Sequence, residues 1–299
     1  MDLIEAESAG TEDLYYIDME LYDSTGYGSV YILDADRPAV IDTGTGRNYE
    51  WILDALAELG IDQDELAVIA PTHVHLDHAG GVGYLAGACP NAEVCVYEAG
   101  AQFLTDPTKI WEGTKQVVGD RIEYYAEPEP VPEERIETFA DDETIDLGDH
   151  SLDVHHAPGH AFHQAVFYDR ANDGVFTADA AGINIPGLDG VRQTSPPPGF
   201  DLAGCLADVE MIQDLDPAVL YYGHFGDREI GDLLDEYATV IEGWVDQVEE
   251  KRAELDDDEA VVEYFVERTE TTSVWSEQHA RGEEEMNVRG VLHYLDSQE

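Results

Sequence analysis

Four ionisable side chains are concentrated in one short run of the sequence. His73, His75, Asp77 and His78 fall within six residues, directly after the apolar segment 66–70. Imidazole and carboxylate groups are ligands for zinc, iron or manganese. Four such groups beside a buried strand would be costly without a cation, so the run predicts a metal site.

The spacing within the run suggests two cations rather than one. In an extended segment, residues i and i+2 point to the same side, so His73 and His75 can converge on one ion. A helix is expected to begin near Asp77, where the side chains of Asp77 and His78 can turn toward a second ion. Gly80, which follows, has no side chain that would crowd this turn.

Four ligands do not complete two metal sites, and the chain offers three more candidates. His160, Asp179 and His224 each follow an apolar strand, in the contexts Pro158-Gly159-His160, Thr177-Ala178-Asp179 and Gly223-His224. Strand ends that meet at one rim of a sheet are a common place for a site. The alternatives are solvated loop histidines and, for Asp179, a helix cap.

With these residues identified, the sequence resembles the metallo-β-lactamase-fold hydrolases over about residues 12–227. The resemblance rests on five motifs in order: Asp42-Thr43-Gly44, the run from His73 to His78, and the three contexts of His160, Asp179 and His224. It implies an α/β fold, a four-layer αββα sandwich, with the site at one edge between two sheets.

The resemblance also implies a role for each residue. The first metal would be held by His73, His75 and His160, and the second by Asp77, His78 and His224, with Asp179 bridging the two. Asp42 would orient these ligands through hydrogen bonds; the alternative is a local turn at a strand end. The cofactors would be two divalent ions, zinc first, with iron or manganese as alternatives.

Two cations in this arrangement imply a hydrolase. A metal-bridging hydroxide would attack a small ester, thioester or lactone, and Asp77 would serve as the catalytic residue by accepting a proton. Leu76 favours this class, because glyoxalase II and related thioesterases and lactonases tolerate a bulky residue there, whereas the nucleases of the superfamily usually have glycine. Three alternatives stay open: a phosphodiesterase or nuclease, a persulfide dioxygenase with one iron, and a metal-binding regulatory protein with little turnover.

Further residues are candidates for binding substrate. Lys109, Lys115 and Arg121 are three of only 14 basic residues and fall within 13 positions. We hypothesise that they form a patch for an anionic substrate group; the alternative is scattered surface charge. His163, three residues after His160, could face the same pocket.

The elements that must position these residues are read from hydrophobic periodicity. A helix is expected over 49–59, where Gly60 suits its end, and a partly helical excursion over 105–134. Strands are expected over 14–17, 28–34, 38–41, 66–70, 91–97, 136–139, 151–155, 164–168, 174–176 and 218–222, and further helices over 201–215, 230–255, 258–268 and 285–295. We expect a catalytic domain over 1–228 and a C-terminal helical appendage over 229–299.

The charge of the chain is extreme. There are 67 acidic against 14 basic residues, giving a formal net charge of −53, and the acids are spread along the whole length. This pattern predicts a halophilic protein in a cytoplasm of high salt, where a Debye length of about 3 Å screens self-repulsion. Since no signal region or apolar run of membrane length is evident, we expect a cytoplasmic enzyme with a small-molecule substrate and neither a membrane nor a nucleic-acid partner.

Overall fold

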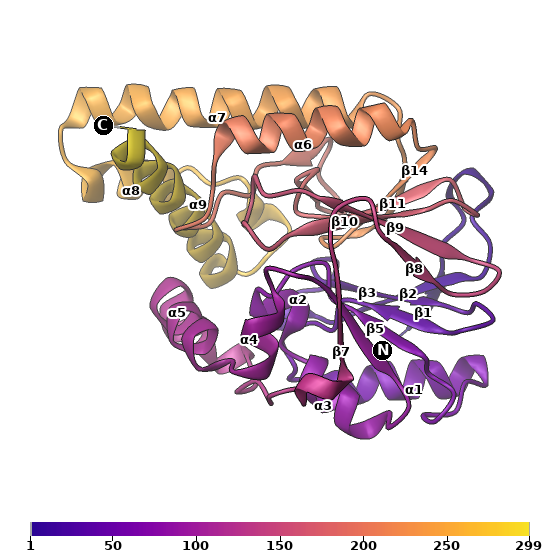
Figure 1. The fold of residues 1–299 in the computed structure, drawn as a ribbon. Coiled ribbons are helices and arrows are strands. Elements are labelled where there is room, and N and C mark those ends of the chain that lie inside the picture. The colour runs from indigo at the N-terminus through magenta and orange to yellow at the C-terminus, as the bar shows by residue number, and fades with distance from the viewer. Residues whose placement is uncertain (1, 299) are drawn as a thin grey trace.

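Two β-sheets face each other in the middle of the molecule, and helices cover both outer faces (Figure 1). This arrangement is seen in a computed structural model, which describes residues 2–298. The layers follow the order helix, sheet, sheet, helix, which confirms the predicted αββα sandwich.

The first sheet is built from the N-terminal half of the chain. Within residues 2–298 it has seven strands in chain order: β1 (Leu3–Glu5), β2 (Leu14–Asp18), β3 (Ser29–Leu33), β4 (Ala39–Ile41), β5 (Val68–Ala70), β6 (Glu93–Tyr97) and β7 (Ile136–Phe139). Neighbours from β1 to β4 are antiparallel, and those from β4 to β7 are parallel. Because β4 and β5 are parallel, the segments that follow them begin at the same edge of the sheet.

The second sheet comes from the next part of the chain. In the described residues its six strands lie in the order β15-β14-β11-β10-β9-β8. Their bounds are β8 (Thr144–Asp146), β9 (Ser151–His156), β10 (Ala165–Asp169), β11 (Gly174–Ala178), β14 (Val219–Tyr222) and β15 (Gly226–Glu229); β12 (Ile183–Asn184) and β13 (Val191–Arg192) form a separate pair. Strands β11 and β14 are parallel, so their ends also reach one edge together.

The outer layers differ in size. The first sheet is covered by α1 (Tyr49–Leu59) and α3 (Val82–Ala88), and the second by α6 (Leu202–Leu215) and α7 (Leu233–Leu255) (Figure 1). Helix α1 has the predicted bounds and ends at Gly60, whose φ of 81° suits a glycine. Among residues 2–298, no helix is both long enough and apolar enough to cross a membrane.

Four more helices gather at one end of the sandwich (Figure 1). They are α4 (Ala101–Thr105), α5 (Thr108–Val118), α8 (Asp258–Val266) and α9 (Glu277–Gln298), and short α2 (Leu76–Ala79) lies beside them. Helix α9 is longer than the helix predicted over 285–295, because its first turns carry few apolar residues to reveal them. Helix α5 contacts both α2 and α9, so it links the histidine run to the C-terminal helices.

The proposed boundary at residue 228 falls just before α7. Helix α7 packs with α6, α8 and α9 in one apolar cluster that also includes Val166, Val175 and Leu220 of the second sheet. The division into two domains stays a prediction.

Candidate metal centre

The histidine run begins in the connection after β5 and continues into α2. His73 and His75 belong to the connection, and the extended backbone of His75 leads into the helix. Asp77 and His78 lie within the single turn of α2. The change from extended to helical backbone therefore separates the run into two pairs, as the sequence predicted.

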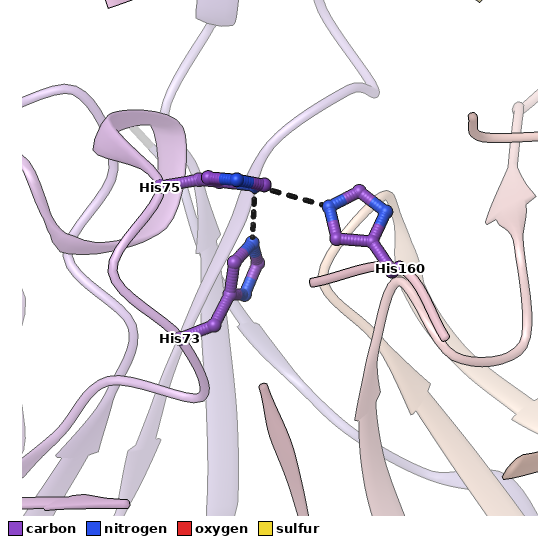
Figure 2. A group of neighbouring side chains, drawn as sticks. All are labelled: His73, His75 and His160. Carbon is purple, nitrogen blue, oxygen red and sulfur yellow. Dashed lines mark hydrogen bonds between the residues drawn. The ribbon is translucent and has the colours of Figure 1, made fainter. Parts of the chain in front are cut away.

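His73 and His75 converge with His160 of the loop after β9 (Figure 2). His75 Nδ1 lies 3.1 Å from His73 Nε2 and 3.0 Å from His160 Nε2. His73 and His160 are buried, at 0% and 3% exposure. Three ring nitrogens that face one another in a buried space are suited to a shared cation.

A second group joins Asp77 and His78 to His224, which follows β14. His78 Nε2 lies 3.2 Å from His224 Nε2, and Asp77 Oδ2 lies 3.7 Å from His224 Nε2. The group combines two imidazoles with one carboxylate, which is an ordinary ligand set for zinc.

Asp179, directly after β11, lies between the two groups. Its Oδ2 is 3.5 Å from His73 Nε2 and 3.4 Å from His160 Nε2, and 3.3 Å from His78 Nε2 on the other side. Its Oδ1 is buried without a hydrogen-bond partner, 3.6 Å from His224 Nε2. One carboxylate directed at both groups, with an unsatisfied oxygen, fits two cations held side by side.

Burial controls the protonation of the first group. It lowers the pKa of His75 to about 4 and holds the pKa of His73 well below its ordinary value, and neighbouring histidines add to both shifts. Burial alone would raise the pKa of Asp179, but His160 and His78 hold it well below its usual range. At neutral pH His73 and His75 are thus neutral imidazoles and Asp179 is a carboxylate, the forms that bind divalent cations.

Two glycines of the motifs are required by close contacts. A Cβ at Gly159 would lie 2.1 Å from the backbone nitrogen of Cys205 in α6, and a Cβ at Gly223 would lie 2.7 Å from His78 Cε1. The loop that carries His160 therefore packs directly on α6, and the turn that carries His224 packs directly on another candidate ligand.

Asp42 lies behind the site and contacts it through His78. His78 Nδ1 donates to Asp42 Oδ2 at 2.8 Å, while Thr72 donates to Asp42 Oδ1 through its backbone nitrogen at 2.8 Å and its hydroxyl at 2.9 Å. A proton held on Nδ1 leaves Nε2 of His78 free to bind a cation. Asp42 is thus placed as the resemblance implied, with the positive φ that an aspartate tolerates.

We expect Asp42→Asn to weaken metal binding about 10–100-fold, because an amide in place of the carboxylate no longer holds His78 in one tautomer. Metal content after dialysis against a graded chelator measures the effect. Asp201→Asn is the matched control, since Asp201 caps α6 through Gly204 and asparagine caps equally well. Equal metal retention in both variants would contradict this role of Asp42.

His163 does not take the place suggested for it. Its side chain is 3% exposed, its ring is stacked at 6.0 Å and 14° against that of His73, and Phe103 and Phe162 lie on its other sides. Within residues 2–298, the pocket beside the centre is lined by other residues. His163 therefore packs against the ring of His73 and does not line the pocket where a substrate would bind.

The expected cationic patch does not line the pocket either: in the described part of the chain, residues 2–298, none of its three basic residues borders the cavity. Lys109 is exposed, and Lys115 pairs with Glu112 at 2.8 Å and lies over the ring of Trp111. Arg121 is buried and paired with Glu283 of α9 at 2.6 Å. Helical geometry turns the two lysines away from the pocket, and tertiary packing neutralises the arginine.

The pocket is lined by residues that the sequence analysis did not single out. A cavity of about 140 Å³ opens on Asp77, Asp179 and His224. Its aromatic wall contains Tyr22, Tyr27 and Tyr125, and its far side is formed by Pro196, Pro197, Pro198, Glu283 and Met286. These residues belong to segments far apart in the chain, and no local pattern distinguishes them from ordinary core or loop residues.

Comparison with known proteins agrees with this geometry. A family profile described as the metallo-beta-lactamase superfamily matches residues 24–224. The metallo-beta-lactamase fold-containing protein ST1585 of Sulfurisphaera tokodaii is 28% identical over 66% of this chain and 72% of its own length. The acyl-coenzyme A thioesterase MBLAC2 of Gallus gallus is 29% identical over 56% of this chain, and the match spans 62% of that protein, less than two thirds.

Solved structures share the fold at low identity. The crystal structure of ST1585 superimposes with a TM-score of 0.67 and 20% identity, covering 94% of this chain and 99% of that one. TTHA1429 from Thermus thermophilus superimposes with a TM-score of 0.68 and 22% identity, covering 97% and 95% of the two chains. These likenesses cover nearly the whole of this chain and concern the fold alone.

Proposed function

The chain belongs to the metallo-β-lactamase superfamily, and on that premise we propose that it is a hydrolase with two divalent metal ions. The observation that carries the proposal is the position of Asp179 between two ligand groups, with an oxygen directed at each. Zinc is the first candidate for the metal, and iron or manganese are alternatives, because imidazole and carboxylate ligands suit all three.

Each residue of the site has a proposed task. One cation would be held by His73, His75 and His160 and the other by Asp77, His78 and His224, with Asp179 shared between them. Bound there, the cations would supply an activated water near neutral pH and polarise the oxygen of the scissile bond. Asp77, whose side chain is 27% exposed and lines the pocket, is the carboxylate placed to accept the proton of that water.

The proposed substrate is a small ester, thioester or lactone. The apolar walls of the pocket support an acyl substrate, and so does the similarity to a protein named an acyl-coenzyme A thioesterase. Leu76, 3% exposed at the pocket, occupies the position where the nucleases of the superfamily usually have glycine. The acidic chain also disfavours a polyanionic substrate at low salt.

Metal content and activity on one preparation test the proposal. We expect about two metal ions per chain, hydrolysis of at least one ester, thioester or lactone, and loss of that activity with a chelator. One iron per chain with oxygen consumption on a persulfide would identify a dioxygenase instead, and faster cleavage of phosphodiesters would identify a nuclease. Bound metal without turnover on any of these substrates would favour a regulatory protein.

We also propose that the protein works in the cytoplasm of an organism with molar internal salt. The support is the excess of 67 acidic over 14 basic residues, spread along the chain. At low salt these charges would repel one another and weaken the fold. Assays of this protein therefore require molar potassium or sodium chloride.

A further inference from the structure

We propose that the pocket beside the metal centre selects an uncharged acyl chain, and that Gly113 of α5 sets the length of chain it accepts. This inference deepens the proposed hydrolase function and rests on it. It is carried by the face that α5 presents to the pocket, by the pairing of the nearest arginine, and by the open space at Gly113.

Helix α5 turns one face toward the pocket. The residues on that face are spaced as successive turns of a helix require, and they are Ile110, Gly113, Thr114, Val117 and Val118. Lys109 and Lys115 alternate with them and lie on other faces of the helix. The wall beside the reacting centre is therefore mostly apolar even though the helix is charged elsewhere.

Arg121, the buried cation in the segment that follows α5, does not line the pocket, and its charge is paired with Glu283. Arg121 donates to Glu283 Oε1 at 2.6 Å and to the carbonyl of Gly282 at 3.0 Å, and Tyr27 donates to Glu283 Oε2 at 2.9 Å. Tyr22 and Tyr125 are likewise engaged with each other, their hydroxyl oxygens 2.6 Å apart. Glu283 itself faces the pocket.

This arrangement discriminates by charge. On the side of the pocket away from the metal centre, a carboxylate or phosphate on the acyl part of a substrate would lose its hydration and meet Glu283 rather than a free cation. An apolar chain loses only contact with water, and each buried methylene should raise kcat/KM by about fourfold. The pocket should thus favour an alkanoyl group over an acidic acyl group of the same shape.

Gly113 leaves space in the middle of this wall. A Cβ at Gly113 would meet no atom within 4 Å, and the residue lines the pocket. A larger side chain would therefore extend into the cavity without disturbing the helix, in which leucine is a better helix former than glycine. The size of the side chain at position 113 therefore limits the length of the acyl chain that fits the pocket.

The test uses Gly113→Leu and a series of thioesters of N-acetylcysteamine in molar salt. Gly87→Leu is the matched control, because Gly87 is also helical, a Cβ there also meets nothing within 4 Å, and it lies in α3 away from the pocket. The acyl groups are acetyl, butanoyl, hexanoyl and octanoyl, together with 4-methylpentanoyl and its acidic shape match, 3-carboxypropanoyl.

For the wild type and Gly87→Leu we expect kcat/KM to rise with chain length, and the 4-methylpentanoyl ester to exceed the 3-carboxypropanoyl ester by about tenfold or more. In Gly113→Leu the ratio of octanoyl to acetyl kcat/KM should fall at least about tenfold. Two results would overturn the inference while leaving the hydrolase assignment intact. One is an octanoyl-to-acetyl ratio in Gly113→Leu that equals the wild-type ratio, and the other is an equal kcat/KM of the wild type for the 4-methylpentanoyl and 3-carboxypropanoyl thioesters. Failure of the wild type on every ester, thioester and lactone would instead overturn the proposed function, and this inference with it.

Discussion

Asp179→Asn is expected to abolish hydrolysis, with a loss of at least about 10³-fold, well beyond the 10–100-fold typical of residues that only orient a ligand. Asp179 is 2% exposed and lies within 3.6 Å of imidazole nitrogens from both groups. An amide has one oxygen and no negative charge, so it cannot serve two cations at once. Metal content should accordingly fall from about two ions per chain to one or none.

A buried aspartate elsewhere provides the control for this change. Asp169 is 0% exposed and pairs with His150 at 3.0 Å in the second sheet, away from the centre. Asp169→Asn should lower stability but leave metal content and activity per folded molecule unchanged. Full metal occupancy in Asp179→Asn, with activity within tenfold of the wild type, would show that the two ligand groups do not share this carboxylate.

Arg121→Ala is expected to destabilise the fold by about 3–5 kcal/mol, because it leaves Glu283 charged and buried without its partner. Both side chains are 7% exposed, and they join the segment after α5 to α9. The guanidinium also lies 5.0 Å above the ring of Tyr22, a contact that the alanine loses. Urea unfolding at constant molar salt measures the change in the free energy of unfolding.

Two further variants separate this structural role from the binding of an anionic substrate. Arg121→Met combined with Glu283→Met should recover much of the lost stability, since removing both charges leaves neither unpaired. Lys115→Glu, on the outer side of α5, should change stability by less than about 0.5 kcal/mol and leave the KM for an anionic ester unchanged. A large rise in that KM would restore the cationic patch expected from the sequence.

The candidate metal centre could be recognised in the sequence because its chemistry is local. Residue type and spacing indicate candidate ligands at His73, His75 and His78, and two more candidates, His160 and His224, follow predicted strands. Parallel strands bring such positions to one edge of a sheet, so an alternation of strands and helices was enough to expect them together. The bounds of α1 and of most strands followed from periodicity for the same reason.

The sequence by itself determined the types of the candidate ligands and their division into two pairs, because both depend on residues close together in the chain; the αββα layers followed from the resemblance that the motifs carry. Only the tertiary structure decided what surrounds them. From the sequence, Arg121 was expected in a patch for an anionic substrate group, but packing buries it against Glu283, 162 residues further along the chain. The same packing of α5 against α9 turns Gly113 inward and both lysines outward, since the environment of a side chain depends on long-range contacts that local spacing does not encode.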